Sequence, residues 1–402
     1  MEETKSKRVG LVARLSDPGG VQSVALSLIR GLNQKGVIPD ILWDVEPSWP
    51  MLEKAGVRAK FTHVPFRFST TLIDRMPLSL RYLAWIINAV DGEQFRRQYD
   101  FVYTVNQVFY FPSDFPHLYY LSGPPLLPQL EMLPRGVKGV PIRFFKWMYR
   151  TFWRTSRPIF EYQRGGKYVI NSHYTARLFK EAHGVDLPVV HPPIKISDRW
   201  FDHSDLSLRD SLVFFSRIVW YKRPYLVLEL AKRHPNYRCV IMGGVQPHQQ
   251  PYFEELQKKA ATMGVKIEFI RNPSDQQVRE ELARAKFYIF PAVNEHFGMT
   301  TPEAIASGAI PFVHDSGGQI EIVIDERLRF SDSELHDKFD ALMKLPDAEL
   351  AQIRKKLVAH VQQYSEEAFW VKMFQHSGPG KSPSLTDVGD CQANNITSFA
   401  KG

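Results

Sequence analysis

The sequence predicts an α/β protein with two domains, each a parallel sheet covered by helices, that face each other across a cleft. A chain of 402 residues is too long for one ordinary hydrophobic core, so two domains are expected. In both halves of the chain, short apolar segments alternate with amphipathic helical patterns, which is typical of parallel sheets. A polar, irregular stretch at 195–208 separates the halves and is interpreted as a linker.

The first half begins with a strand, a glycine turn, a helix and a strand. We expect the first strand at 8–13, the turn at 14–20, a helix that ends at Gly36 and the second strand at 38–43. The apolar face of the helix consists of Val21, Val24, Leu28 and Leu32. Further strands are expected at 101–105, 118–121 and 167–170.

The second half continues the alternation. Strands are expected at 211–216, 238–243, 266–270, 286–291 and 310–313. Helices are expected at 224–233, 251–263, 275–284 and 302–307. Because ligands of parallel sheets bind beyond the carboxyl ends of the strands, the cleft between the two domains is the expected site.

The predicted organisation has four parts. Residues 1–200 form the first domain, 201–364 the second, and 365–376 a last helix. Residues 377–402 contain turn formers without periodicity, so we expect a disordered tail.

Composition favours a reducing, cytoplasmic environment. Cys239 lies in an apolar run and Cys391 in a polar tail, so no disulfide is expected. The opening residues MEETKSK are polar, and no window approaches the 18 apolar residues of a membrane span. The net charge of +8 makes an anionic partner an expectation.

The segment 294–308, NEHFGMTTPEAIASG, follows an apolar run and precedes another. Thr301 is the predicted N-cap of a short helix, Pro302 its first residue and Gly308 its stop. Such a helix start at the carboxyl end of a strand would offer N–H groups to an anion.

The two acids of this segment each allow two interpretations. Glu303 either complements the helix dipole or accepts hydrogen bonds from two vicinal ribose hydroxyls. Glu295, in the loop ahead of the helix, is either a solvated acid or a group that faces a substrate.

The segment 294–323 resembles the E-x7-E region of the retaining GT-B glycosyltransferases of family 4, in the EHFG form found in lipid-linked mannosyltransferases. DPGGVQ at 17–22, FFSRIVWYKRP at 214–224 and the segment 169–194 resemble other parts of the same family. Over residues 8–375 the resemblance implies the GT-B fold: two Rossmann-like domains, the first holding an acceptor and the second a nucleotide sugar.

The resemblance also implies the site residues. Glu295 would order the donor sugar, Glu303 the ribose, and Arg217 and Lys222 would neutralise the diphosphate leaving group, although a lone surface cation is usually just solvated. The implied donor site comprises Gly19, Gly20, Arg217, Lys222, Glu295, Gly298, Met299, Thr300 and Glu303.

The sequence has no D-x-D and no metal-ligand spacing of His, Cys and Asp. Two fixed cations can replace a divalent ion at a diphosphate, so we expect no metal and no cofactor besides a GDP- or UDP-sugar donor.

One position departs from the family. Many relatives carry a His in a Y-x-H-x-P pattern of the first domain, and here YYLSGPP at 119–125 places Ser122 there. His117 lies five residues upstream, at the far end of the strand, and cannot simply substitute. Either Ser122 contacts the donor sugar or acceptor more weakly, or a different group has taken that catalytic role.

The stretch 135–167 mixes cations with aromatics and has nine Lys or Arg against one acid. It predicts an interfacial helix on anionic lipid, a core helix with a solvated basic face, or a nucleic-acid surface. The resemblance favours the first, at the cytoplasmic face of a membrane, so no nucleic acid is expected. The membrane-facing residues would be Arg143, Lys146, Trp147, Arg150, Trp153 and Arg154.

The implied activity is retaining transfer of a hexose, with mannose favoured, from a nucleotide diphosphate sugar to a glycan or lipid-linked acceptor. The alternative is a non-catalytic sugar-nucleotide-binding or scaffold protein. The change at Ser122 favours it, and the intact set of Arg217, Lys222, Glu295 and Glu303 argues against it. A dinucleotide oxidoreductase is disfavoured because no G-x-G-x-x-G follows either opening strand.

Overall fold

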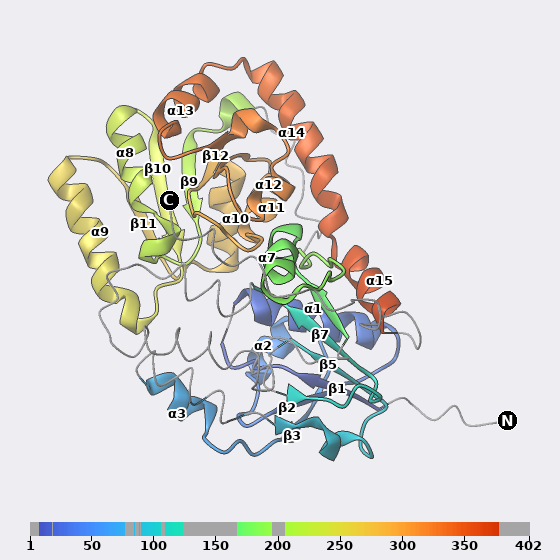
Figure 1. Cartoon of the computed structure of the whole chain (residues 1–402). Coiled ribbons are helices and arrows are strands. Elements are labelled where there is room, and N and C mark those ends of the chain that lie inside the picture. The colour runs from blue at the N-terminus through green and yellow to red at the C-terminus, as the bar shows by residue number, and fades with distance from the viewer. Residues whose placement is uncertain are drawn as a thin grey trace, which may run out of the picture.

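The computed structural model describes residues 8–17, 19–76, 84, 88, 90–105, 109–123, 167–194 and 206–377. Two six-stranded parallel sheets, each flanked by helices, lie one above the other in Figure 1. The predicted α/β class with two Rossmann-like domains is therefore confirmed.

The sheet of the first domain has the order β3-β2-β1-β5-β7-β8. Gly10 lies at its centre, where an added Cβ would sit 2.9 Å from Leu42 Cδ1, so a larger residue would displace the Leu42 side chain. The strands are β1 (Val9–Val12), β2 (Asp40–Trp43), β3 (Lys60–His63), β5 (Phe101–Thr104), β7 (His117–Leu121) and β8 (Tyr168–Ile170). A separate small pair joins β4 (Val90–Asp91) to β6 (Phe109–Tyr110).

The helices of this domain include α1, which follows the glycine turn as expected. Its apolar positions Val24, Leu28 and Leu32 are buried against the sheet, and Gly36 ends it in a left-handed conformation. The described helices are α1 (Gly20–Gln34), α2 (Trp49–Lys54), α3 (Thr70–Arg75) and α7 (His173–His183).

The sheet of the second domain has the order β11-β10-β9-β12-β13-β14. Its strands are β9 (Ser211–Phe215), β10 (Arg238–Gly243), β11 (Glu268–Arg271), β12 (Ala285–Phe290), β13 (Ile310–His314) and β14 (Arg329–Phe330). Its helices are α8 (Tyr225–Arg233), α9 (Gln250–Met263), α10 (Asp275–Arg284), α11 (Thr300–Ala306), α12 (Gln319–Ile322), α13 (Leu335–Met343) and α14 (Asp347–Val361). Because β9 and β12 are neighbours, the loops that leave their carboxyl ends meet.

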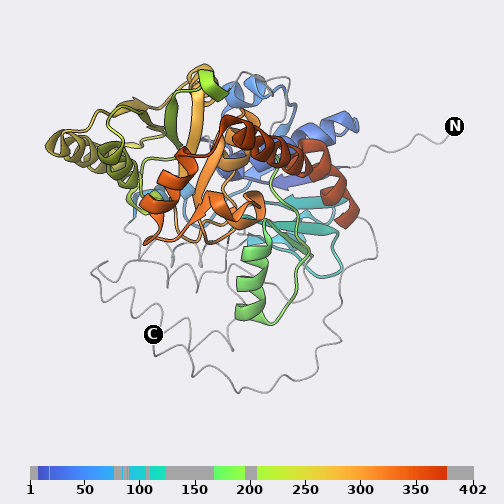
Figure 2. The same cartoon turned by 90° about the horizontal axis from the view of Figure 1, so that it is seen from above.

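The last helix, α15 (Glu366–His376), belongs to the first domain although it follows the second. Figures 1 and 2 show α14 and α15, in red, leading from one sheet to the other. The indole N–H of Trp370 donates to Ser27 O at 2.8 Å, and the ring packs on Gly31, where a Cβ would approach it to 2.7 Å. Arg30 of α1 pairs with Glu366 at the start of α15.

Candidate functional site

Lys222 and Glu295 form an ion pair at the carboxyl edge of the second sheet. Lys222 ends a short 3-10 turn, Trp220–Lys222, after β9, and Glu295 lies in the loop after β12. Their side chains are 10% and 17% exposed, so the pair is largely removed from water. The structure thus joins two residues that the sequence places on separate loops.

The electrostatics of the pair favour an ionised carboxylate. Burial alone would raise the pKa of Glu295, but Lys222, His296 and Arg217 more than offset this and hold the pKa below its usual value. The Lys222 ammonium also lies 5.1 Å from the centroid of the Phe290 ring, a cation–π contact. Two opposite charges are therefore fixed side by side in a poorly hydrated place.

Arg217 lies two residues after β9, and its side chain is exposed. Its charge contributes to the low pKa of Glu295, which places it within electrostatic range of the ion pair. In the described part of the chain, no ion pair or side-chain hydrogen bond engages it. Arg217 is thus a cation available to an incoming anion.

The loop that carries Glu295 is clamped by a glycine turn after β13. Gly318 N–H donates to Glu295 O at 2.7 Å, and a Cβ on Gly317 would lie 2.4 Å from the same carbonyl oxygen. Gly298 has φ 92° and leaves room for Gln319, since a Cβ there would lie 1.6 Å from Gln319 Nε2. Gly317 and Gly318 thus permit the backbone contact that holds Glu295, and Gly298 makes room for the Gln319 side chain.

The helix after this loop differs from the prediction in its start. α11 begins at Thr300, two residues before Pro302, and Thr301 is not its N-cap. Thr301 is buried, and its hydroxyl donates to Gln319 Oε1 at 2.7 Å, so a tertiary contact replaces the cap. That the N–H groups at this helix start bind an anion stays a prediction.

Tyr288 of β12 contacts both the end of β9 and the start of α11. Its hydroxyl bonds Thr300 Oγ1 at 2.7 Å and donates to Phe215 O, the end of β9, at 3.3 Å. Burial raises the pKa of Tyr288, and the charges of Glu303 and Glu295 raise it further. Both acids therefore lie within electrostatic range of one buried hydroxyl.

The glycine turn of the first domain reaches the same region. A Cβ on Gly20 would lie 3.3 Å from Met299 Sδ, so this turn abuts the loop before α11. Gly19 has an extended φ of 178°, and a Cβ there would lie 2.6 Å from Gln22 Oε1. The predicted donor-site residues of the two domains thus face each other across the domain boundary.

Ser122 follows β7 and is half-buried. Its carbonyl accepts a hydrogen bond from Asn171 Nδ2 at 2.7 Å, and among the described residues no hydrogen bond joins Ser122 to Lys222 or Glu295. His117 is fully buried at the other end of β7, where burial lowers its pKa to about 4. His117 is therefore a neutral core histidine, in agreement with its exclusion from the site.

A carboxylate of the second domain caps a helix of the first. Glu321 accepts hydrogen bonds from the backbone N–H groups of His173 (3.0 Å) and Tyr174 (2.8 Å) at the start of α7. His191 Nε2 lies 3.0 Å from the same carboxylate. Glu321, His173 and His191 lie close enough for a metal ion, but both oxygens of Glu321 are already engaged, so we interpret the cluster as a link between domains.

A second link comes from Ser172, which donates its hydroxyl to His296 O at 2.6 Å. His296 follows Glu295, so the domain contact is one residue from the ion pair.

Sequence patterns did not single out Tyr288, Gln319 or Glu321 as parts of the site. The paired glycines of SGGQIE could have indicated that Gln319 and Glu321 lie near the site, because paired glycines allow two backbone segments to approach closely.

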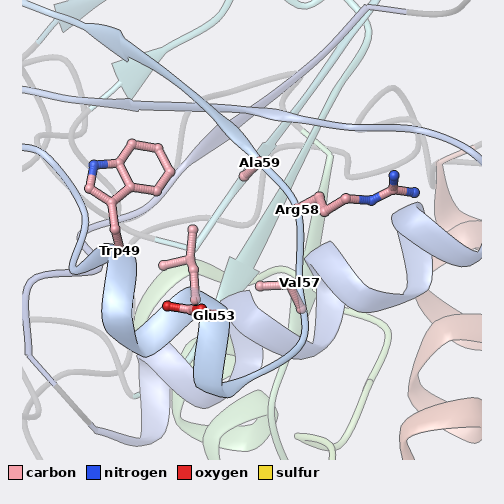
Figure 3. Close-up of a pocket in the computed structure, with 6 residues that line it drawn as sticks. Trp49, Glu53, Val57, Arg58 and Ala59 are labelled. Carbon is pink, nitrogen blue, oxygen red and sulfur yellow. The ribbon is translucent and has the colours of Figure 1, made fainter.

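Figure 3 shows a separate hollow on the first domain, between α2 and the segment that leads to β3. None of the predicted site residues lines it. Lys54 of α2 pairs at 2.9 Å with Asp275 at the start of α10. The lining residues are Trp49, Leu52, Glu53, Val57, Arg58 and Ala59.

The predicted membrane-facing residues between Arg143 and Arg154 lie outside the described residues, as do Cys391 and the tail from 378 onward. Among the described helices, none combines the length and apolar character that a bilayer span requires. Cys239 is buried and unpaired, and burial raises its thiol pKa to about 12.

Residues 199–358 match the family model described as glycosyl transferases group 1. A Xenopus laevis GDP-Man:Man(3)GlcNAc(2)-PP-Dol alpha-1,2-mannosyltransferase is 24% identical over 157 residues, which cover 37% of this chain and 32% of that protein. The lipopolysaccharide core biosynthesis mannosyltransferase LpcC of Rhizobium leguminosarum bv. viciae is 25% identical over 185 residues, 45% of this chain and 50% of that protein. The matched segments thus cover 32% and 50% of the length of these two curated relatives.

Among solved structures, Anabaena Alr3699/HepE in complex with UDP and glucose has a TM-score of 0.64 at 15% identity, covering 92% of this chain and 98% of that one. This likeness shows the fold. The predicted GT-B fold and the resemblance to family 4 glycosyltransferases are therefore confirmed.

Proposed function

We propose that this GT-B chain, with its group 1 glycosyl transferase segment at 199–358, transfers a hexose from a nucleotide diphosphate sugar to a glycan or lipid-linked acceptor. The observation that carries the proposal is the Lys222–Glu295 ion pair beside the uncommitted cation Arg217. These groups lie where the loops of two neighbouring parallel strands meet, the usual ligand position in such a sheet.

The chemistry requires positive charge at the leaving group. When the bond between the sugar and the phosphate breaks, negative charge grows on the departing diphosphate. Arg217 and Lys222 would neutralise that charge, and their effect is strong because the surroundings of Lys222 are poorly hydrated. We propose that the two cations make the transfer independent of a metal ion.

Glu295 has two tasks in this scheme. In the unliganded protein it neutralises Lys222, which would otherwise be a buried, unpaired charge. With donor bound, Lys222 is shared with the diphosphate, and the ionised Glu295 can accept hydrogen bonds from sugar hydroxyls. Glu303 would accept the ribose hydroxyls from the first turn of α11.

We propose that the sugar keeps its anomeric configuration. The departing phosphate, held by Arg217 and Lys222, would stay on one face of the sugar and accept the proton of the attacking hydroxyl on that same face. The acceptor would enter from the first domain, past Gly20, which abuts the second-domain loop at Met299, and past Ser122, which follows β7.

Mannose from a guanine nucleotide is the favoured donor, because the two curated relatives are named as mannosyltransferases and one of them as GDP-Man dependent. The HepE structure contains UDP and glucose, so a UDP-sugar is the other candidate. The name of one relative contains a dolichol-linked glycan, and the name of the other refers to lipopolysaccharide core biosynthesis. Both names support a lipid-linked acceptor here.

The deciding experiment is calorimetric and thermal-shift screening of GDP-, UDP- and ADP-sugars, with and without EDTA. We expect one nucleotide class to bind and stabilise the protein, with binding retained after chelation. ¹H NMR of the transfer product should then show a retained anomeric configuration. Binding without transfer to any acceptor would support the non-catalytic alternative that Ser122 suggests, and no binding at all would reject the proposed function.

We further propose that the basic aromatic stretch at 143–154 contacts an anionic membrane at its cytoplasmic face. The basis is the sequence pattern and the lipid-linked acceptors of the relatives. Charge reversal at Arg143, Lys146 and Arg150 should abolish co-sedimentation with phosphatidylserine vesicles. Unchanged co-sedimentation would reject this part of the proposal.

A further inference from the structure

Two residues next to the ion pair adopt an unusual backbone conformation. Arg223, which follows Lys222, has φ 58°, and Asn294, which precedes Glu295, has φ 54°. Among the described residues other than glycine, Asn272 alone shares this left-handed conformation. Side chains with a Cβ rarely adopt it, and such backbone persists where surrounding contacts enforce it.

Contacts that can enforce it are present on both sides. Arg223 Nη1 donates a hydrogen bond to Pro291 O at 3.2 Å. Pro291 directly follows β12, so the residue after Lys222 is bonded to the start of the loop that carries Glu295. Asn294 N–H donates to Ser316 Oγ at 2.8 Å. Each left-handed residue is therefore fixed by a neighbouring loop.

His314 connects these two contacts. Its Nδ1 lies 2.8 Å from Ser316 Oγ, and its Nε2 lies 3.3 Å from Asp332 Oδ1, which also accepts from Arg223 Nη2 at 2.6 Å. One tautomer satisfies every group: the Ser316 hydroxyl donates to Nδ1, and Nε2–H donates to Asp332. Burial lowers the pKa of His314, which favours this neutral form.

We propose that Arg223, His314 and Ser316 are positioning residues that hold Lys222 and Glu295 in register with each other. They act through the backbone of Arg223 and Asn294 and not by touching the donor. Their importance for transfer rests on the proposed function, whereas their effect on the geometry of the ion pair does not.

Exposure ranks the members of this chain of hydrogen bonds. The side chains of Arg223 and His314 are 14% and 12% exposed, whereas Asp332 is 63% exposed and its contribution is weakened by water. The Ser316–His314 end should therefore matter more than the Asp332 end. This ranking gives an internal control within the network.

The test measures the coupling between Lys222 and Glu295. Unfolding constants of the parent, Lys222→Met, Glu295→Gln and the double variant define that coupling as a ratio. The cycle is repeated in a Ser316→Ala background and in a Ser331→Ala background. Ser331 is the matched control, because its hydroxyl bonds Glu334 at 2.5 Å at the start of α13, outside the network.

We expect Ser316→Ala to reduce the coupling ratio about tenfold, and Ser331→Ala to change it less than twofold. His314→Phe, which keeps a ring against Phe330 (5.7 Å between centroids), is the second variant and should act like Ser316→Ala, while Asp332→Asn should have a smaller effect. An unchanged coupling ratio in both Ser316→Ala and His314→Phe would overturn the proposal, since a merely structural role lowers stability without altering the coupling.

Binding of GDP and UDP, measured by calorimetry on the same proteins, separates this inference from the proposed function. If the wild type binds neither nucleotide, the proposed function fails while the coupling cycle still decides the inference. If the wild type binds, Ser316→Ala should weaken the affinity about tenfold, and this loss should fall below twofold in the Lys222→Met background.

Discussion

Replacing Lys222 by methionine would leave the Glu295 carboxylate without its partner. Because the two side chains are 10% and 17% exposed, little water can take the place of the ammonium. Removing one member of a buried ion pair costs about 3–5 kcal/mol. We expect a loss of about 3 kcal/mol, at the low end, because the exposed Arg217 still stabilises the carboxylate. For a domain of this size, that loss lowers Tm by about 6–12 °C.

The pH dependence of stability should have opposite signs in the two proteins. In the wild type, burial raises the pKa of Glu295, but Lys222 and the nearby cations lower it by more. Glu295 then contributes stability above its unfolded-state pKa, and this is lost as the pH falls through the lower folded-state pKa. In Lys222→Met, burial dominates, the folded-state pKa exceeds the unfolded one, and the variant recovers stability as the pH falls.

Urea unfolding at pH 7 and pH 5, followed by tryptophan fluorescence, measures the cost of Lys222→Met and its change with pH. A further measurement at about pH 3.5 tests the wild-type loss, which occurs only below the unfolded-state pKa of a glutamate, about 4.3. Lys54→Met is the matched control, because the Lys54–Asp275 pair is 73% and 63% exposed and should contribute under about 1 kcal/mol. Adding Glu295→Gln to Lys222→Met should restore part of the loss. The reasoning is refuted if Lys222→Met costs no more than Lys54→Met, or if its cost is the same at both pH values.

Three further predictions follow from the placement of single side chains. Arg217→Gln should lower kcat/KM for transfer at least tenfold and lower Tm much less than Lys222→Met does, since Arg217 is exposed; intact kinetics would remove it from the site. Glu303→Gln should weaken donor affinity about tenfold in calorimetry, and full affinity would leave Glu303 with a helix-dipole role alone. Trp370→Ala should cost about 3–5 kcal/mol in urea unfolding, because a buried ring and its bond to Ser27 are lost; a loss below about 1 kcal/mol would contradict the described packing.

Alternating apolar segments predicted most of the strands correctly, because buried parallel strands are continuous apolar runs. The helices were predicted less completely, and α7, α13 and α14 were missed. The strand at Lys60–His63 was missed, since an edge strand with exposed ends lacks such a run. The start of α11 was predicted wrongly for a different reason. Thr301 has the side chain of an N-cap, but a contact with Gln319, 18 residues later, takes its hydroxyl.

The candidate site was predictable as far as strand ends could be located. Lys222 and Glu295 each follow a strand, and their meeting required the neighbour relation of β9 and β12, which no local pattern encodes. The Glu321 link to α7 was beyond reach for the same reason, since 148 positions separate it from His173. The left-handed backbone of Arg223 was hidden too, because arginine carries no turn signal.

The position of α15 affects the order in which the chain can fold during synthesis. Phe369, Trp370 and Met373 are part of the hydrophobic core of the first domain, next to residues of α1 and the first sheet. A ribosome therefore releases the whole second domain before the first one receives its last core residues. Until then the first domain keeps an exposed apolar surface. The second domain, whose core is complete by Tyr364, is therefore expected to reach its native state first.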